Sequence, residues 1–287
     1  MAELLNGYRP DLTVPHTSLL ELHANPMSHC SRKVCLALEE VGADFAYRHV
    51  DLIETGTFGN LSDAYLAVNP GGLVPTLVEQ GHPVYESDRQ LEHIASRYPK
   101  AGLMGGSEAE QAAIAKWLRQ LELSTKDAEA QMDTRLGACI PGLTLPFLAG
   151  MIARVPLRRF GLGLRRHRHK ERLAAFLAMR VLGPKRFLSL GKPAQIRDDG
   201  ARYAKAHLAS IAQHLSGRRW LAGERYTLAD ISFTCLLLRV REAGLWGELV
   251  GGDAALNDYW NRTTVRPAFA KASAQGFLGP STRSDLP

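Results

Sequence analysis

Apolar residues along the first part of the chain switch between the spacing of strands and that of a helix. Residues 18–23 (SLLELH) and 45–52 (FAYRHVDL) have the apolar and partly alternating composition of strands. Between them, from Val34 to Val41, apolar residues fall at i, i+3, i+4 and i+7, which is one face of a helix. The order strand, helix, strand predicts a parallel pair joined by a right-handed crossover.

A short helix and two further strands are predicted next. Residues 63–68 have helical spacing, and the breaker Asn69-Pro70-Gly71-Gly72 separates them from the apolar residues 74–78. Gly81-His82 then turns the chain back into residues 83–85, which predicts a hairpin.

The end of this α/β unit is marked by one more helix and a linker. Ser87 with Gln90 fits the S-x-x-Q capping box of a helix that runs to about Tyr98. Residues 99–106 (PKAGLMGG) are rich in proline and glycine, as interdomain linkers are.

The rest of the chain has helical periodicity. We expect a long amphipathic helix over 108–136 and another over 193–216. Thr227 and Asp230 form a capping box, with Tyr226 and Ile231 at the staple positions, and it opens an apolar helix. The pattern predicts a second, all-helical domain.

An uncharged segment of eighteen residues, 136–153, interrupts this domain. It contains Pro141, Pro146 and three glycines, and it is shorter than the roughly 20 residues of a membrane span. We expect a buried or lid-like segment.

Composition and charge add a basic region to this picture. The 287 residues, 45% of them hydrophobic, are enough for two domains, and the net charge is +6. Residues 154–192 hold twelve Lys or Arg and one acid, Glu171. Such a patch suits an anionic lipid surface or an anionic substrate, or it is a solvated helix face. No stacking aromatic residues interleave with RRHRHKER (165–172), so no nucleic-acid partner is predicted.

The cysteines predict a reduced protein without a metal. Cys30, Cys35, Cys139 and Cys235 show no metal-ligand clustering. Residues 1–17 carry Pro, Asp and Arg where a signal peptide needs an apolar run, so a cytoplasmic location is expected.

Candidate chemistry lies at the start of the first helix, where Ser28, Cys30 and Ser31 follow the first strand. Unpaired N–H groups and the helix dipole favour an anion there, whether the thiolate of Cys30 or that of a bound thiol ligand. Arg32 and Lys33 add positive charge. In the alternative interpretation, Ser28 only caps the helix and Cys30 only fills space.

Two further stretches complete the candidate site. A cis peptide bond before Pro75 would expose the Val74 backbone as an edge for a peptide ligand. Glu86 and Ser87, at the start of the next helix, could clamp an amino-acid head group. The helix N–H groups would take its carboxylate and Glu86 its ammonium group.

These stretches, Ser28-His29-Cys30-Ser31, Val74-Pro75-Thr76-Leu77 and Glu86-Ser87, together resemble the glutathione transferases. The resemblance implies an α/β thioredoxin-like N-terminal domain plus an all-α C-terminal domain. Its expected divisions are an extension (1–17), the glutathione-binding domain (18–99), a linker (100–107) and a helical substrate domain (108–287) with an insertion at about 137–192.

The resemblance also implies roles for these residues. Ser28 or Cys30 would lie beside the glutathione sulfur, with Ser31 nearby, and Val74 would pair with the cysteinyl residue ahead of a cis Pro75. Glu86 and Ser87 would hold the γ-glutamyl end. Leu73 stands where relatives often carry a polar side chain, so the anchor of the glycine carboxylate is not identified.

The S-x-C-S stretch is most similar to zeta-class maleylacetoacetate isomerases and tetrachlorohydroquinone reductive dehalogenases. The implied activity is attack of a glutathione thiolate on a hydrophobic, aromatic electrophile, in detoxification or aromatic catabolism. Conjugation, thiolytic ether cleavage, reductive dehalogenation and cis-trans isomerisation all remain open, as does a non-catalytic protein at a membrane surface that uses residues 154–192. A homodimer is expected.

Overall fold

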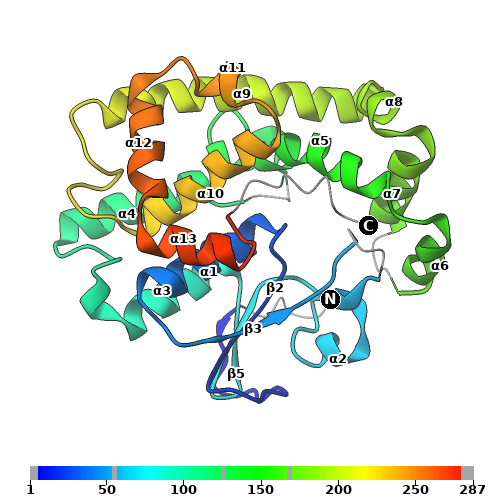
Figure 1. Ribbon diagram of the computed structural model, residues 1–287, viewed down its shortest axis with the longest axis horizontal. Coiled ribbons are helices and arrows are strands. Elements are labelled where there is room, and N and C mark those ends of the chain that lie inside the picture. The colour runs from blue at the N-terminus through cyan, green and yellow to red at the C-terminus, as the bar shows by residue number, and fades with distance from the viewer. Residues whose placement is uncertain (1–5, 54–56, 124–126, 167–169, 279–287) are drawn as a thin grey trace.

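The computed structural model describes residues 6–53, 57–123, 127–166 and 170–278, with the side chains at 162 and 164–166 excepted. In Figure 1 the strands, with α1 (His29–Glu40), α2 (Asp63–Leu66) and α3 (Ser87–Arg97) beside them, occupy the lower part of the view, and a larger group of helices lies above. The two parts correspond to the predicted α/β and all-helical domains.

The sheet has five strands in the order β1-β5-β4-β2-β3. They are β1 (Gly7–Tyr8), β2 (Leu20–Ala24), β3 (Ala46–His49), β4 (Thr76–Glu79) and β5 (His82–Tyr85). The pair β2 and β3 is parallel, and β4 and β5 form an antiparallel hairpin. The strand, helix, strand unit and the hairpin are therefore confirmed.

Helices cover both faces of this sheet, because each strand directs apolar side chains to both faces in alternation. Leu77 points into the large core that includes residues of α1 (His29–Glu40) and α3 (Ser87–Arg97). Its neighbour Val78 belongs to a separate cluster with Tyr65 of α2 (Asp63–Leu66). Successive side chains on a strand point to opposite faces, which gives the two layers.

The N-terminal extension contributes the edge strand β1, which the sequence did not predict. Tyr8 is opposite Val84 of β5 in an antiparallel pair. Farther along, Val14 is buried and its N–H donates to the carbonyl of Gly81 at 2.9 Å. Two residues of strand carry too little pattern to be recognised without their partner.

The helical domain is built around α10 (Leu228–Glu242), whose residues from Leu228 to Val240 are all buried. Around it lie α4 (Glu108–Leu121), α9 (Gly191–Leu215), α11 (Trp246–Leu249), α12 (Ala254–Thr264) and α13 (Pro267–Ala274). The capping box of Thr227 and Asp230 is present, as predicted.

Two boundary predictions are wrong. The helix α4 ends at Leu121 instead of 136, because Glu122 has an extended backbone and Gly137 packs against its carbonyl so closely that a Cβ on Gly137 would lie 2.0 Å from the oxygen. Among the described residues between Glu122 and Cys139, short 3-10 turns follow, Glu129–Gln131 and Leu136–Cys139. Gly137 lies far beyond the helix end in sequence, so no residue near Leu121 indicated that the helix stops there.

The predicted capping box of α3 is also absent. Its N-cap is Glu86, one residue earlier than expected, with a left-handed φ of 64°. The Gln90 side chain does not return to the helix start but donates to the carbonyls of Pro75 and Val84, at 2.9 and 2.8 Å.

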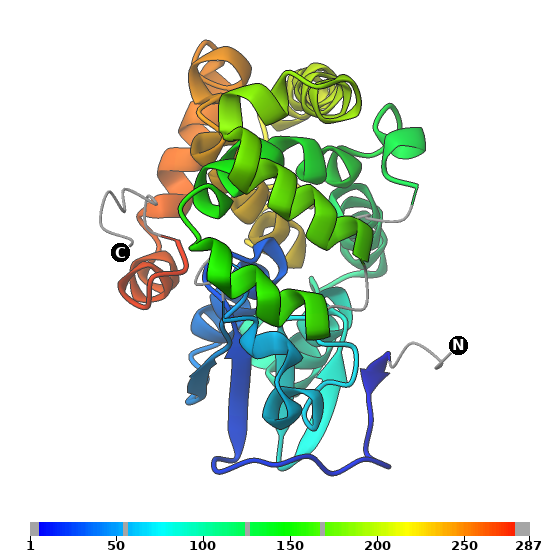
Figure 2. The same ribbon diagram turned by 90° about the vertical axis from the view of Figure 1, so that its right-hand side faces the viewer.

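The expected insertion folds into four helices with a cluster of their own. These are α5 (Ile140–Ile152), α6 (Leu157–Arg166), α7 (Lys170–Leu182) and α8 (Pro184–Leu188). Their cluster includes Phe58 from the loop after β3, and a Cβ on Gly163 would lie 2.8 Å from the Phe58 ring. Figure 2 shows the insertion reaching down onto this part of the N-terminal domain. Among the described residues, no helix is long and apolar enough to cross a membrane.

Candidate functional site

The loop between β2 and α1 presents Ser28 at the helix start. Ser28 is the N-cap of α1, and its hydroxyl oxygen accepts a hydrogen bond from the Ser31 N–H at 3.3 Å. Asn25 fixes the loop, because its carbonyl accepts from the Ser28 N–H and its side-chain oxygen from the Met27 N–H. Within the described residues, the Ser28 hydroxyl donates to no protein group, so its proton is available to a ligand.

Ser31 and Cys30 occupy different environments. The Ser31 side chain is fully buried, and its hydroxyl accepts from the Asn25 N–H at 3.3 Å, within the loop. Cys30 is only partly buried, and Ser87 lies close enough to act on its thiol. Burial raises the pKa of the Cys30 thiol, although Lys33 and Ser87 act in the opposite direction. Cys30 is therefore a neutral thiol at pH 7.

The Val74-Pro75 peptide bond is cis, as the sequence interpretation required. Tyr65 and Asn69 hold the segment before it by donating to the carbonyl of Leu73, at 2.6 and 3.1 Å. Within the described residues, neither the N–H nor the carbonyl of Val74 has a hydrogen-bond partner. This backbone edge is free to pair with an extended peptide.

The start of α3 carries the third set of groups. Ser87 is its first residue, and the first N–H groups of a helix have no intrahelical partner. The Glu86 side chain is exposed. Partial burial of its carboxyl, with the negative charges of Asp88 and Glu122, raises the pKa of Glu86. A carboxylate in such surroundings is stabilised by a ligand's ammonium group.

Direct contacts join these three segments. Lys33 of α1 is fully buried and forms a 2.6 Å ion pair with Asp88 of α3. Cys30 meets Ser87 at the same junction, and Gln90 of α3 holds the carbonyl of Pro75. The predicted groups at residues 28–30, 74–75 and 86–87 therefore surround one region. A hydroxyl, a peptide edge, and a helix N-terminus with a carboxylate suit a tripeptide thiol with an amino-acid end.

The sequence analysis missed a buried ionic network beneath this region. Arg32, expected to add positive charge at the start of α1, forms two 2.6 Å hydrogen bonds with the Glu242 carboxylate. Arg239 also pairs with Glu242, at 2.9 Å. The available signal was a pair of charged residues at i and i+3, Arg239 and Glu242, at the end of a helix whose middle is apolar.

His29 is a further buried group of the site. Neither ring nitrogen makes a well-formed hydrogen bond to a described residue, although the Cys235 backbone lies close to the ring. Burial, with the charges of Lys33, Arg239 and Arg32, depresses the pKa of His29 well below its ordinary value. His29 is neutral at pH 7.

Two hollows of about 740 and 390 Å³ lie elsewhere, in the helical domain. The first is lined by residues of α12 and the end of α9, and the second by residues of α4 and α9. No residue of the candidate site lines either of them.

Comparison with protein families matches this organisation. The model for the glutathione S-transferase N-terminal domain matches residues 27–97, and that for the C-terminal domain matches residues 171–267. Together they cover more than half of the chain.

Individual relatives span nearly the whole chain. "Glutathione S-transferase TCHQD" of Arabidopsis thaliana is 22% identical over 267 residues, 91% of each chain. The tetrachloro-p-hydroquinone reductive dehalogenase of Sphingobium chlorophenolicum is 25% identical over 261 residues, 88% of this chain and 95% of its own. The crystal structure of the beta-etherase LigF from Sphingobium sp. strain SYK-6 matches with a TM-score of 0.69 at 22% identity, covering 90% of this chain and all of that one.

The thioredoxin-like sheet, the helical second domain and the two family matches lead to one assignment. The chain belongs to the glutathione S-transferase superfamily, and glutathione is its ligand.

Proposed function

We propose that this protein is a glutathione-dependent transferase that activates the glutathione thiolate for attack on a hydrophobic, aromatic electrophile. The observation that carries the proposal is the Ser28 hydroxyl, which stands at the N-terminus of α1 with its proton unused by the protein. An oriented donor in the field of a helix N-terminus stabilises the developing anion, here a thiolate.

The other candidate residues would hold the rest of glutathione. The Val74 backbone, exposed by the cis Pro75, would pair with the cysteinyl residue, and Glu86 and Ser87 would bind the γ-glutamyl ammonium and carboxylate groups. Ser31 would act through the loop, because its hydroxyl is already bonded to Asn25.

Conjugation, or thiolytic ether cleavage, is favoured over reduction. Reduction would require the Cys30 thiolate to attack the sulfur of a glutathione conjugate, forming a Cys30-glutathione disulfide and releasing the substrate carbon with a proton. A second glutathione would then free Cys30 as glutathione disulfide is formed. Since burial raises the pKa of the Cys30 thiol, that attack is disfavoured at neutral pH. One relative is named a reductive dehalogenase and another a beta-etherase, so the test includes both chemistries. It also includes the isomerisation that the sequence resemblance left open.

The test is retention on a glutathione resin, followed by a panel that measures halide, phenol and isomer release with glutathione. We expect phenol release or a stable conjugate, and Cys30→Ser should still release it. Accumulation of glutathionylated product in Cys30→Ser, with a transient Cys30 mixed disulfide in the intact enzyme, would instead establish the reductive route. Absence of glutathione binding would contradict the proposal.

We further propose a cytoplasmic homodimer, in which the first domain of one protomer contacts the second domain of the other. Four free cysteines suit a reducing compartment, and twofold dimers are the commonest closed assembly.

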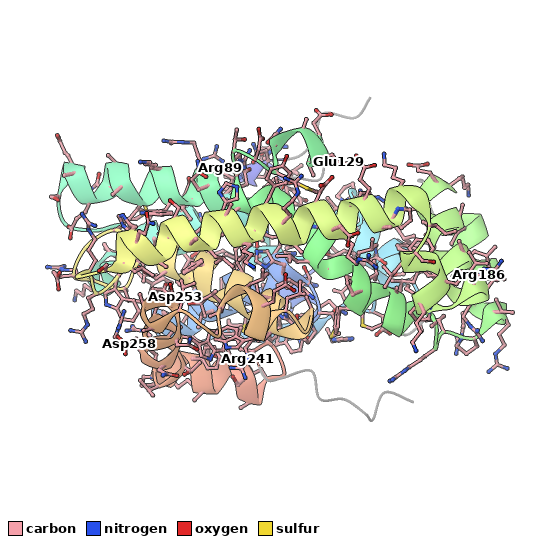
Figure 3. All side chains as sticks on the ribbon, turned by 90° about the horizontal axis from the view of Figure 1, so that it is seen from above. Arg89, Glu129, Arg186, Arg241, Asp253 and Asp258 are labelled. Atoms are coloured by element: carbon pink, nitrogen blue, oxygen red, sulfur yellow. The ribbon has the colours of Figure 1, made fainter. Side chains whose placement is uncertain are left out.

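A second candidate function, contact with an anionic membrane surface, is favoured by one exposed face of the insertion. Along α7, Leu177 and Val181 are 40% and 65% exposed, and Ala174 extends their stripe. The exposed cations Lys185 and Arg186 follow, and Figure 3 shows Arg186 at this end of the molecule. Co-sedimentation with vesicles of anionic but not neutral phospholipid, lost in Leu177→Ser with Val181→Ser, would support this function. Equal sedimentation with both vesicle types would contradict it.

A further inference from the structure

Three cations are buried beneath the start of α1, and two carboxylates pair with them. Arg32 and Lys33 of α1 and Arg239 of α10 are each at most 1% exposed. Lys33 pairs with Asp88, whereas Arg32 and Arg239 both pair with Glu242. Among the described residues, this arrangement leaves one positive charge without a carboxylate of its own. A buried charge of this kind is expensive unless something compensates it.

The same two guanidinium groups hold the loop that leads to Ser28. The Nε of Arg32 donates to the carbonyl of Pro26 at 2.7 Å. Arg239 donates through Nη2 to the carbonyl of Met27, also at 2.7 Å. The two peptide groups that precede Ser28 are therefore fixed by guanidinium groups that share one carboxylate. The orientation of the Ser28 hydroxyl depends on this arrangement.

The Arg239 guanidinium group has a hydrogen-bond donor that no described residue uses. Its Nε is buried and finds no acceptor among the described residues. The guanidinium carbon lies 5.3 Å from the ring centre of Phe147, on the insertion helix α5. Burial and the nearby Arg32 charge lower the pKa of Arg239 to about 10, so it stays charged at pH 7 in surroundings that disfavour the charge.

The neighbouring titratable groups do not supply the missing negative charge to Arg239. Glu86 is a further carboxylate near the start of α1, but its charge interacts with Lys33 and Asp88 and not with Arg239. His29, on α1, is neutral at pH 7, and Cys30 and Cys235 have thiol pKa values raised by burial. Phe147, the contact from α5, carries no charge. A bound anion at the start of α1 is therefore what would compensate the excess cation.

We infer that Arg239 is a positioning residue, which aligns Ser28 through the Met27 carbonyl and whose charge favours a thiolate beside Ser28. This inference rests on the proposed function, in which glutathione supplies that thiolate. Arg239 acts from below the loop and not by touching the ligand. It ties the insertion, through Phe147, to the thiol-activating loop.

The test compares the titration of bound glutathione in four proteins: wild type, Arg239→Met, Arg239→Lys and Arg241→Met. Thiolate ultraviolet absorbance in the complex gives the thiol pKa, and turnover gives kcat and KM. Arg241 is the matched control. It lies two residues away on the same helix, is exposed, and has its guanidinium carbon 4.9 Å from the Trp246 ring centre (Figure 3).

Arg239→Met should reduce the thiolate fraction of bound glutathione, measured below the thiol pKa, by about 3- to 30-fold, as expected for one unit charge at the intermediate dielectric of a protein. Arg241→Met should leave that fraction unchanged. Arg239→Lys keeps the charge and should keep the thiolate. The lysine ammonium group cannot replace a planar guanidinium group that contacts both the Met27 carbonyl and the Glu242 carboxylate. We therefore expect kcat to fall while KM for glutathione stays the same.

An unchanged thiol titration in folded Arg239→Met would overturn the inference. Should circular dichroism show that this variant does not fold, Arg239→Lys decides, and a wild-type kcat there would overturn it equally. Failure of the wild type to bind glutathione would count against the proposed function. If Ser28→Ala shifts the thiol pKa and Arg239→Met does not, only the role of Arg239 is wrong.

Discussion

Glu86 shows how much of this site depends on single residues. Its backbone has a φ of 64°, in the left-handed region, and this conformation starts α3 and aims the helix N-terminus at the neighbourhood of Cys30. Residues other than glycine rarely adopt such a φ, so the Glu86 backbone is strained. Strained backbone of this kind is typical of ligand-binding sites. The carboxylate is in place for an ammonium group but has no partner of its own among the described residues.

We predict that Glu86→Gln, which preserves the side-chain shape, weakens glutathione binding by about 1 to 3 kcal/mol, because a charge-assisted hydrogen bond is lost. Ser87→Ala should have an effect of similar size. Calorimetry on folded protein measures both. Glu92→Gln, on the exposed side of the same helix, is the control. Wild-type affinity in both site variants would remove these residues from the ligand site.

The same carboxylate predicts a pH dependence. Glu86 binds the ammonium group only when ionised, and partial burial with Asp88 and Glu122 raises its pKa above the usual 4.5. Affinity for glutathione should therefore fall as the pH is lowered, beginning above the pH at which an ordinary glutamate is protonated. Calorimetry from pH 7.5 down to 4.5 tests this. The Glu86→Gln variant should lack this component, and a wild type with equal affinity across the range would contradict it.

Residue chemistry was predictable from sequence where it depended on neighbours in the chain. Ser28 at a helix start, and proline at the start of a strand, were both evident from local pattern. The partners of Arg32 and Lys33 were not, because Glu242 and Asp88 are 210 and 55 residues away. The sequence therefore predicted positive charge at the start of α1 but not the ion pairs that Arg32 and Lys33 form.

At the level of elements, the helical domain depends on a close crossing of α5 and α9. Gly142 and Gly200 face each other there, and a Cβ on Gly142 would lie 2.4 Å from the carbonyl oxygen of Ile196. Backbone atoms cannot move aside as a flexible side chain can.

Gly142→Ala should therefore lower the free energy of unfolding by about 2 to 4 kcal/mol, in the upper range for overpacking. Gly150→Ala, in the same helix with no atom within 4 Å of the added Cβ, should be neutral or stabilise by up to about 1 kcal/mol from helix propensity. Urea unfolding compares the two. Equal stabilities of the two variants would show that the crossing is looser than described.

The capping box of α10 predicts a second stability effect. Asp230 accepts hydrogen bonds from the N–H groups of Leu221 and Thr227, the Thr227 hydroxyl and the Tyr259 hydroxyl, at 2.9 to 3.0 Å. Asp230→Ala leaves these buried donors unpaired and should reduce stability by about 2 to 5 kcal/mol. Asp258→Ala, an exposed aspartate on α12, is the control for the same urea experiment. A loss of less than 1 kcal/mol, about the value of a single cap, would mean that the network contributes little.

The sequence predicted which helices and strands exist better than it predicted where each one begins and ends. The Thr227 and Asp230 box was evident because its hydrogen bonds lie within four residues. The end of α4 was not, since it depends on the contact of Gly137 with Glu122. The structure starts α3 one residue away from the predicted position, because the Gln90 side chain donates to the carbonyls of Pro75 and Val84 and does not cap the helix.

For the whole molecule, the sequence predicted a thioredoxin-like domain followed by a helical domain, and the structure confirms both. It did not predict where the helices of the expected insertion are placed. Phe58 joins the insertion cluster, so the extra helices contact the loop after β3 as well as the helical domain. This contact pairs residues about 100 positions apart, Phe58 with Gly163, which no periodicity reveals.

The assembly prediction belongs to the same scale. We expect a homodimer, and light scattering at micromolar concentration should give about twice the 31.5 kDa chain mass. A monomer mass under those conditions would contradict it. Glutathione binding by that monomer would leave the site proposal intact.

The most direct test of the whole account is the thiol pKa of glutathione bound to the wild type and to Ser28→Ala, read by thiolate absorbance together with turnover. We predict that binding to the wild type lowers this pKa below that of free glutathione. Ser28→Ala should raise it again and slow turnover by about 10- to 1,000-fold, the range for losing one oriented donor. If bound glutathione titrates in the wild type as it does in water, or if Ser28→Ala changes neither quantity, the start of α1 is not where this protein activates the thiol.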